Sequence, residues 1–513
     1  MKTQPIKSSR KPKGFPMTAT TNYLAYDLGA SSGRAVIGRF DGERIALEEI
    51  HRFENNGIPV GANYYWDILR LYEEMRVGLR KAVQSAKTLN GLGFDTWGVD
   101  FGLLDAQDEL LGNPRCYRDA RTQGMFAEVF KRIPREEVFE QTGIQFMELN
   151  TLYQLLAMRL QNAPQLNMAK TFLTMPDLFN FWFTGRKTCE FSNATTTQFY
   201  DPRKKTWAYD LLDTLSIPTD MFPEIIQPGT ILGATRDTLN QELGISAVDV
   251  IAPACHDTGS AVAAVPLGSP DDVYISCGTW ALMGAEISEP AINKKALEHN
   301  FTNEGGVCNT FRFLKNITGL WLVQECRRVW NLAGKNYDWT QLSALANEAP
   351  LLKSFIDPDH ADFGTPGDMP KRIQQACKKN DQPIPETHGQ IVRTALESLA
   401  LKCRYTLHQL EDALGKTMGN IHIVGGGIQN TLLCQFIANA TGRTVLAGPI
   451  EATAMGNLLI QAMAKGQVGS HSELREIVRN STTIKTYEPA HTDAWNDAYQ
   501  TFASRVVNNR NDQ

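Results

Sequence analysis

The sequence lacks the features that mark several classes of protein. Its nine cysteines include no C-x-x-C pair, and a disulfide framework is unusual in so long a chain, so we expect free thiols in a reducing compartment. The nine histidines form no H-E-x-x-H or other zinc-binding spacing. No apolar run approaches the roughly 20 residues of a membrane span, and no hydrophobic signal core is seen at the N-terminus. We therefore expect a cytoplasmic protein without a membrane partner.

An excess of charge of one sign is also missing. The net charge is −5 over 513 residues, which argues against a surface that coats nucleic acid. Hydrophobic residues make up 42% and charged residues 21%, as in ordinary globular proteins. Since single cores stop growing at roughly 250–300 residues, more than one domain is expected.

Two familiar nucleotide-binding motifs are absent. The G-K-T at 415–417 would need a glycine at position 410 to be a P-loop, but that residue is Leu410 and a helical pattern precedes it. The stretch 91–98 reads G-x-G-x-x-x-x-G, which is not the dinucleotide fingerprint. A nucleotide would have to be held by another kind of turn.

The sequence does contain a β unit that occurs twice, about half the chain apart. Residues 22–50 read as strand, glycine turn, strand, Asp41-Gly42 turn and strand, and 92–104 reads as further β structure. Residues 272–287 repeat the pattern of strand, glycine turn and strand. A helix capped by Asp67 and a longer one between Thr387 and Gly415 are also predicted. This pattern indicates two similar α/β halves.

A cluster of Pro266, Gly268 and Pro270 predicts the boundary between the halves. We expect an N-terminal domain over 21–265 and a C-terminal domain over 266–505. Residues 1–20, which carry five basic residues and no acid, are expected to be a flexible tail, and 506–513 a second tail.

Each half offers a turn that could hold phosphate. Asp27 ends the first strand, and the small residues from Gly29 to Gly33 let backbone N–H groups face an anion. The carboxylate of Asp27 would be placed to hold a magnesium ion, usually through water. Cys277-Gly278-Thr279 repeats this logic in the second half. Each motif alone could be a simple hairpin turn, but the pair would clamp a triphosphate between domains.

Three further motifs could complete a site. Gly425-Gly426-Gly427 follows a strand over 421–424, and would admit a flat ligand such as adenine or form only a tight connection. Asp257 precedes Thr258 and a run of small residues, where it could accept a proton from a sugar hydroxyl or cap a helix. The stretch 95–100 combines polar residues with an aromatic face, which suits a sugar or half-buried sheet equally well.

In this order, the motifs resemble those of the FGGY carbohydrate kinases, over roughly residues 22–500. Within that family, longer strings resemble one subgroup of ketose kinases. These strings are DLGASSGR at 27–34, DTWGVDFGLLD at 95–105, YRDARTQG at 117–124, NTLYQL at 150–155, NATTTQ at 193–198, HDTGSAV at 256–262, TNEGG at 302–306, NITGLWL at 316–322 and HIVGGGIQNTLL at 422–433.

The resemblance implies two actin-like (ribonuclease H-like) domains with mixed sheets and the site in the cleft between them. It implies ATP with Mg²⁺ mainly on the C-terminal domain, a small ketose mainly on the N-terminal one, and Asp257 as the base that takes the proton from O1. The chain would act as a monomer or homodimer. The implied ATP-binding residues are Ala30, Ser31, Ser32, Gly33, Arg34, Thr279, Gln324 and Gly426, and the implied sugar-binding residues are Gly98, His256, Asp257, Thr258 and Asn316.

Three alternatives remain at this stage. One is a kinase of the same family for a different ketose, such as L-fuculose or a pentulose. Another is an inactive sugar sensor, which would be expected to lack the base, whereas Asp257 and both turns are present. A third, an Hsp70-like ATPase, predicts a peptide-binding appendage that we do not find in the sequence.

Overall fold

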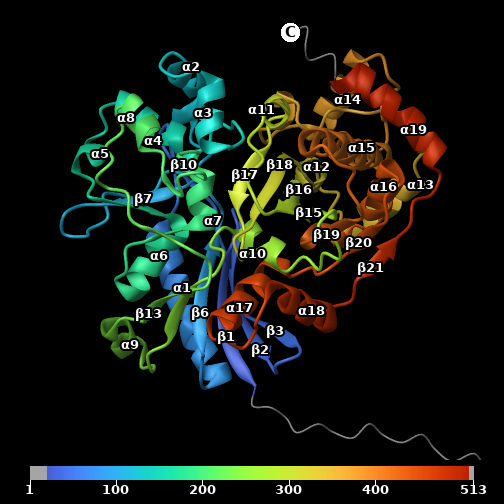
Figure 1. The fold of residues 1–513 in the computed structure, drawn as a ribbon. Helices are drawn as coiled ribbons and strands as arrows, with labels where there is room; N and C mark the ends of the chain where they lie inside the picture. The colour runs from blue at the N-terminus through green and yellow to red at the C-terminus, as the bar shows by residue number, and fades with distance from the viewer. Residues whose placement is uncertain (1–19, 508–513) are drawn as a thin grey trace, which may run out of the picture.

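The computed structural model describes residues 20–507. The two expected tails therefore lie outside the described residues, apart from residue 20 and residues 506–507. Figure 1 shows two α/β halves side by side, the N-terminal half in blue to green and the C-terminal half mainly in yellow to red. No helix within residues 20–507 is long and apolar enough to cross a membrane.

The N-terminal half is built on a six-stranded mixed sheet of order β13-β14-β6-β1-β2-β3. Strand β1 pairs antiparallel with β2 and parallel with β6. Helix α1 (Ile68–Ala86) packs on this sheet, and the side chain of Asp67 caps it by accepting from the Arg70 backbone N–H, as predicted. The strands are β1 (Thr21–Leu28), β2 (Ser32–Phe40), β3 (Ile45–Glu54), β6 (Gly91–Thr96), β13 (Thr230–Ala234) and β14 (Asp249–Ala252).

The C-terminal half is built on a seven-stranded mixed sheet of order β17-β18-β16-β15-β19-β20-β21. The long helix α15 (His388–Leu414) begins at a capping box on Thr387 and ends at Gly415, whose φ of 66° suits glycine, as predicted. The strands are β15 (Val273–Cys277), β16 (Trp280–Ile287), β17 (Thr302–Gly305), β18 (Phe311–Thr318), β19 (Ile421–Val424), β20 (Val445–Ala447) and β21 (Lys485–Tyr487).

The two sheets share one topology. In each, the first strand pairs antiparallel with the second and parallel with a strand that follows later in the chain: β1 with β2 and β6, and β15 with β16 and β19. Beyond the parallel partner in each sheet lie one more parallel strand and then an antiparallel edge strand, although β13 precedes β14 in the chain whereas β21 follows β20. The predicted fold class, two α/β domains with mixed sheets, is confirmed.

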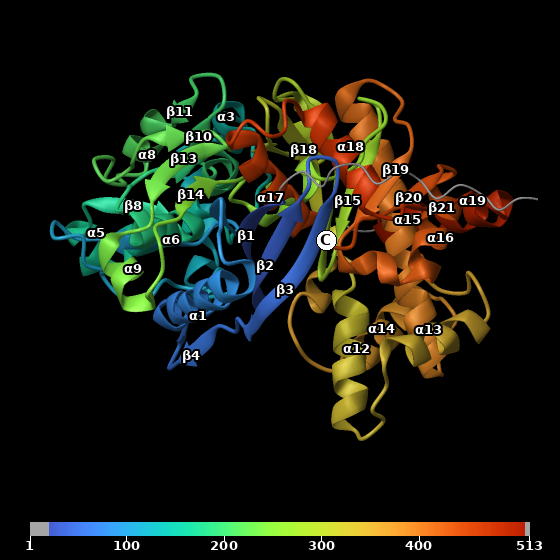
Figure 2. The ribbon, with the colours of Figure 1, turned by 90° about the horizontal axis from the view of Figure 1, so that it is seen from below.

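Two helices join the halves beneath the cleft: α10 (Asp257–Ala263), which follows β14, and α17 (Ala452–Ala464), which follows β20. A Cβ on Gly456 of α17 would lie 1.8 Å from the Ser260 carbonyl oxygen of α10, so the two backbones touch. Helix α17 also packs on β1 and β6 of the N-terminal sheet, although it lies in the C-terminal half of the sequence (Figure 2). One hydrophobic core thus includes parts of both halves.

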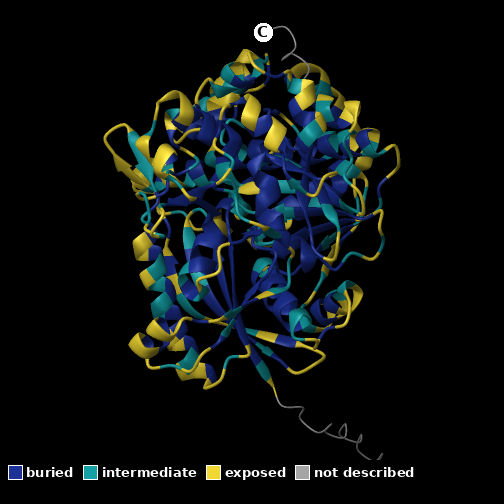
Figure 3. Ribbon diagram, turned by 60° about the vertical axis from the view of Figure 1, so that its left-hand side comes forward, coloured by how far each residue is buried: buried dark blue, intermediate teal, exposed yellow. Residues whose placement is uncertain are grey.

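The remaining elements surround the two sheets, and Figure 3 shows exposed residues on the outer helices and loops and buried ones in the strands. These elements are β4 (Ile58–Val60), β5 (Asn63–Tyr65), β7 (Phe101–Leu104), η1 (Ala120–Thr122), α2 (Met125–Phe130), α3 (Arg135–Thr142), α4 (Thr151–Leu160), α5 (Pro164–Met168), β8 (Thr171–Thr174), α6 (Met175–Thr184), β9 (Cys189–Glu190), α7 (Phe191–Ala194), η2 (Thr195–Thr197), β10 (Tyr200–Asp201), β11 (Thr206–Trp207), α8 (Tyr209–Thr214), β12 (Ile225–Ile226), α9 (Asp237–Leu243), α11 (Lys294–Glu298), α12 (Trp321–Leu332), α13 (Trp339–Glu348), η3 (Ala361–Phe363), α14 (Met369–Lys379), η4 (Gly426–Gln429), α16 (Thr431–Thr441), α18 (His471–Ser481), α19 (Thr492–Thr501) and η5 (Phe502–Val507).

Candidate active site

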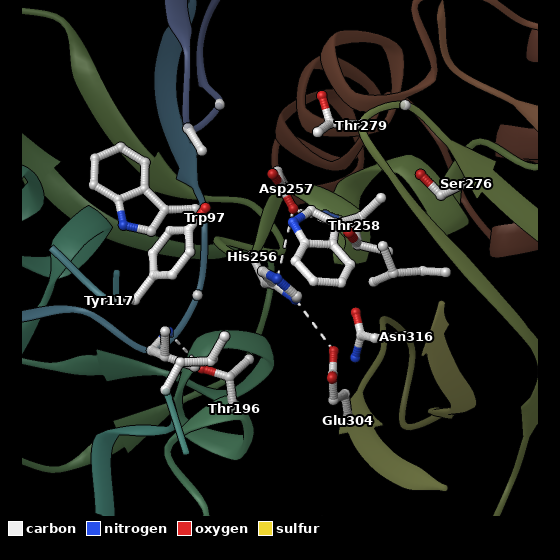
Figure 4. Close-up of a pocket in the computed structure, with 18 of the residues that line it drawn as sticks. Trp97, Tyr117, Thr196, His256, Asp257, Thr258, Ser276, Thr279, Glu304 and Asn316 are labelled. Carbon is white, nitrogen blue, oxygen red and sulfur yellow. Dashed lines mark hydrogen bonds and ion pairs between the residues drawn. The ribbon is translucent and has the colours of Figure 1, made fainter. Parts of the chain in front are cut away.

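A cleft of about 420 Å³ lies between the two halves. Its walls bring together motifs that are far apart in the sequence. Figure 4 shows Asp257 in the middle, with Trp97 and Tyr117 on one side and Ser276 and Thr279 on the other. The predicted site residues that line it are Ala30, Ser31, Ser32, Gly98, His256, Asp257, Thr258, Thr279, Asn316 and Gly426.

Asp257 begins helix α10 at the floor of the cleft. Its Oδ1 accepts hydrogen bonds from the backbone N–H and the hydroxyl of Thr258 and lies 3.5 Å from Nε2 of His256. Within residues 20–507 no donor bonds to Oδ2. Burial raises the pKa of Asp257; His256 opposes this shift, and the negative charge of Asp27 adds to it. A carboxylate with one oxygen held and the other open suits a proton acceptor.

Asp27 is the penultimate residue of β1, next to the first turn. Its Oδ2 accepts two hydrogen bonds from Arg34, at 3.0 and 2.7 Å. Arg34 also forms an ion pair with Glu451, which immediately precedes α17. Because the guanidinium of Arg34 is held by these two carboxylates, it links β2 to the start of α17 instead of pointing freely into the cleft.

The first turn is a rigid frame of backbone hydrogen bonds. The Gly29 N–H donates to the Ser32 carbonyl at 2.9 Å. Asn55, which follows β3, donates from its side chain to the Gly29 carbonyl at 2.7 Å and from its backbone to the Ser31 carbonyl at 3.1 Å. These bonds leave Ala30, Ser31 and Ser32 on the wall of the cleft, where small residues admit a ligand close to the backbone.

The second turn faces the first across the cleft. The Gly278 carbonyl accepts from the Leu320 N–H at 2.9 Å and the Thr279 carbonyl from the Gly319 N–H at 3.0 Å, so the start of α12 supports this turn. Gly425 has a φ of 88°, and a Cβ on Gly427 would lie 2.3 Å from the Cys277 sulfur. A Cβ on Gly426, by contrast, would meet no atom within 4 Å. The glycine run therefore packs against the turn but leaves open space at Gly426.

An aromatic wall occupies the side of the cleft opposite Thr279. A buried carboxylate, Asp100, holds it: its Oδ2 accepts from the indoles of Trp66 and Trp97 at 2.6 and 2.9 Å and from the Tyr117 N–H at 3.1 Å. Gln154 donates to its Oδ1 at 3.0 Å. Burial raises the pKa of Asp100 to about 6, although these donors oppose the shift. Trp97 and Tyr117 thus form a fixed apolar face of the kind that packs on a sugar ring.

Val99, next to Gly98, has a φ of 66°, an uncommon conformation for a β-branched residue. Its N–H donates to Thr196 at 3.1 Å, and its carbonyl accepts from Thr151 at 2.6 Å and from Gln154. Such backbone strain costs of order 1–3 kcal/mol and persists where surrounding contacts hold it, commonly at ligand sites. On the other wall, Asn316 donates from its backbone and its side chain to Gln145.

Three predicted ATP-binding residues and the predicted metal-binding residue Asp27 do not line the cleft in this structure. Arg34 is engaged by its two carboxylates, Gly33 lies beneath the Phe53 ring, and Gln324 lies on α12. Sequence reasoning also missed several residues around the cleft. The strings TNEGG and NATTTQ pointed to Glu304 and Thr196 without a role, and the stretch 95–100 pointed to Asp100 without a role. Nothing local pointed to Asn55, Gln145 or Arg312.

Two phosphate-type turns from similar halves and a carboxylate between them define a two-domain phosphotransferase. Comparison with known proteins gives the family. The FGGY family of carbohydrate kinases matches in both parts, its N-terminal domain at residues 22–264 and its C-terminal domain at 273–465. The chain belongs to the FGGY family of carbohydrate kinases.

The chain is also similar to individual members of this family. The chain is 42% identical to a rhamnulokinase of Oceanobacillus iheyensis, over 90% of this chain and 97% of that protein. It is 41% identical to a rhamnulokinase of Bacteroides thetaiotaomicron, over 94% and 99%. Among solved structures, the fold is similar to gluconate kinase from Lactobacillus acidophilus, with a TM-score of 0.79 at 16% identity over 95% of this chain and 97% of that one. Xylulose kinase from the same organism has a TM-score of 0.77 at 15% identity, over 94% and 97%.

Proposed function

We propose that this carbohydrate kinase transfers the γ-phosphoryl group of ATP to O1 of L-rhamnulose, a step of L-rhamnose catabolism. The observation that carries the proposal is Asp257, whose open Oδ2 lies in the cleft between an aromatic wall and two phosphate-type turns. The rhamnulokinases to which the chain is similar over nearly their full length support this choice of sugar.

The reaction needs little covalent help from the protein, because phosphoryl transfer depends mainly on positioning and on stabilising charge. Asp257 Oδ2 accepts the proton of the C1 hydroxyl while O1 attacks the γ-phosphorus in line with the departing ADP. Backbone N–H groups of the turns at 30–32 and at Thr279 face the phosphate oxygens and stabilise the charge that builds up on them. The sugar ring packs on Trp97, with Gly98, His256, Thr258 and Asn316 around its hydroxyls.

Asp27 fits a magnesium ion that is held chiefly by ATP and water. Its Oδ2 is engaged by Arg34, and Oδ1 has no donor within the described residues. No group of three His, Cys, Asp or Glu side chains in residues 20–507 forms a ready-made metal site, but Mg²⁺ usually needs only one or two carboxylates beside phosphates and waters. The ion would neutralise charge on the phosphates.

We also propose that the N- and C-terminal domains meet near residue 266 and that the protein works in the cytoplasm. The two matched family domains, which end at 264 and begin at 273, support the boundary. All nine cysteines lie in the described part of the chain and are free, which supports a reducing compartment.

Steady-state kinetics on two sugars test the proposed substrate. L-Rhamnulose and L-fuculose are 6-deoxy-ketoses that differ only at C4. A site whose polar groups hydrogen-bond the C4 hydroxyl of one sugar leaves those buried groups without a partner when the other sugar binds. This costs about 1–3 kcal/mol per group. We expect kcat/KM to favour L-rhamnulose by about one to two decades, since about 1.4 kcal/mol is tenfold. Equal efficiencies, or a preference for L-fuculose, would reject this sugar and leave the family assignment intact.

A further inference from the structure

A buried ion pair of the C-terminal sheet extends to the residues at the floor of the cleft. Glu304 on β17 and Arg312 on β18 are register partners, and Arg312 Nη2 lies 3.1 Å from Glu304 Oε2. Arg312 is fully buried and Glu304 is only 6% exposed. A second guanidinium nitrogen, Nε, donates to the Gly305 carbonyl at 2.8 Å, which fixes the plane of the arginine side chain.

The pair ends on the imidazole of His256. Nδ1 of this ring lies 3.3 Å from Glu304 Oε2 and 3.1 Å from Arg312 Nη2, while Nε2 lies 3.5 Å from Oδ1 of Asp257. Figure 4 shows the ring between the two carboxylates, with Glu304 reaching it from the wall opposite the aromatic side chains. The four side chains therefore form one continuous row, Arg312–Glu304–His256–Asp257, that links the C-terminal sheet to the start of α10.

The position of the ring proton follows from this row. If Nδ1 accepts a hydrogen bond from Arg312, the proton of a neutral ring must be on Nε2. This tautomer directs an Nε2–H toward Oδ1 of Asp257, 3.5 Å away. Oδ1 also accepts two hydrogen bonds from Thr258, so Oδ2 is left for the sugar.

The charge of Glu304 is maintained in the buried site. Burial alone would raise its pKa, but Arg312 and then His256 outweigh this effect and lower the pKa of Glu304. Taking two charges out of water is costly, and a buried ion pair is often no more stabilising than apolar residues of the same volume. Because the Glu304–Arg312 pair contacts His256, the neighbour of the proposed base, we expect it to do more than stabilise the fold.

We propose that Glu304 and Arg312 are positioning residues for phosphoryl transfer, which hold His256 so that Asp257 presents Oδ2 to the sugar hydroxyl. The proposal rests on the proposed function, in which Asp257 is the base. The pair acts through His256, so its loss should slow the chemical step more than it weakens binding of either substrate.

The test compares Glu304→Gln with Glu397→Gln in the full-length protein. Glu397 is a matched control: it is buried on α15, Arg393 donates to it at 2.7 Å and the Leu352 N–H at 2.8 Å, and it does not line the cleft. Because a small misplacement of a catalytic group can cost about 100-fold in rate, we expect E304Q to lower kcat by about 10–100-fold. The KM values for ketose and ATP should change little, and E397Q should keep the wild-type kcat even where its melting temperature falls as much.

Conservative variants complete the test. Glu304→Asp keeps the charge and should recover part of the lost kcat. If E304Q does not fold, Arg312→Lys tests the same claim, because lysine keeps the charge but cannot reach Glu304, His256 and Gly305 together. Wild-type kcat in a folded E304Q or R312K protein would overturn the proposal, as would a raised ketose KM at unchanged kcat, which would mean direct contact with the sugar. Failure of the underlying function has a different signature: the wild type would be inactive on the ketose, or Asp257→Asn would remain active.

Discussion

The two turns that face each other across the cleft have the same backbone frame but different chemistry. In the N-terminal half, Asp27 is the penultimate residue of β1, and the parallel neighbour β6 has Asp95 at the paired position. In the C-terminal half, the corresponding pair is Ser276 of β15 and Val424 of β19, followed by glycines. One fold has therefore been specialised in two ways: an acidic side suited to a metal ion and a proton, and a neutral side that a nucleotide can approach closely.

Crowding of carboxylates on the acidic side has an electrostatic consequence. Burial and then the charge of Asp27 raise the pKa of Asp95 well above its usual value, although Asn457 of α17 donates to its Oδ2 at 2.6 Å. The pKa of Asp257 is raised by burial and by the same Asp27. Like charges this close disfavour ionisation of one another. The acidic half thus depends on contacts from the C-terminal half, from Asn457 and Glu451, for its geometry.

The largest expected effect is on the acidic side. Asp257→Asn should lower kcat by about 10²–10⁴-fold, the usual contribution of a general base, while ATP binding and the melting temperature stay close to wild type. Turnover measurements and thermal melting check this. Asp249→Asn is a matched control, because Asp249 pairs with Lys465 away from the cleft lining, and it should be nearly fully active. A folded D257N protein with wild-type turnover would remove Asp257 from the mechanism.

Asp27→Asn should have the next largest effect. Loss of the charge at the end of β1 should raise the Mg²⁺ concentration needed for half-maximal activity and lower kcat by about 10–100-fold, as is typical when a group that orients a metal site is lost. A magnesium titration at saturating ATP measures both quantities. Thermal melting controls for the lost Arg34 contact. An unchanged magnesium titration in a folded variant would contradict the proposed role.

Gly456→Ala tests the contact that joins the halves. The new Cβ would overlap the Ser260 carbonyl, and overpacking of this kind costs about 1–3 kcal/mol. We expect a melting temperature lower by several degrees and a reduced kcat, because α10 carries Asp257. Gly364→Ala, where the nearest atom would be 3.5 Å from the new Cβ, is the control. Equal stability of the two variants would show that α10 and α17 can separate freely.

Thr279→Ala should have the smallest effect, on the neutral side. One hydroxyl contributes about 0.5–1.5 kcal/mol through a hydrogen bond, so the KM for ATP should rise a few-fold at nearly constant kcat. The comparison of the two turns thus predicts that T279A changes mainly the KM for ATP, whereas D27N and D257N lower kcat. A loss of kcat as large as that of D27N would mean that the neutral turn also takes part in the chemistry.

Much of the fold follows from local sequence patterns. The three strands of the first unit, the Asp67 cap, the Thr387 cap and the Gly415 end of α15 are all present where predicted. The β segment at 92–104 is more instructive, because it reads as continuous but is divided at Val99. Strand β6 joins the large sheet, while β7 pairs with β8 in a separate two-stranded sheet. Thr196 and Thr151, which are distant in sequence, hold this break open.

The sequence by itself determined several of the elements, the two related turns and the position of Asp257 before a run of small residues. Their signals are local: caps, glycine turns and side-chain periodicity act within a few residues, so they are readable one segment at a time. Only the tertiary structure decided that α17 packs on the N-terminal sheet, that Arg34 bonds Asp27 and Glu451, and that Glu304 and Arg312 reach His256. Except for the Arg34–Asp27 pair, these contacts join residues that are remote in the chain, and their energies depend on burial and charge, which exist only once both sheets have closed around the cleft.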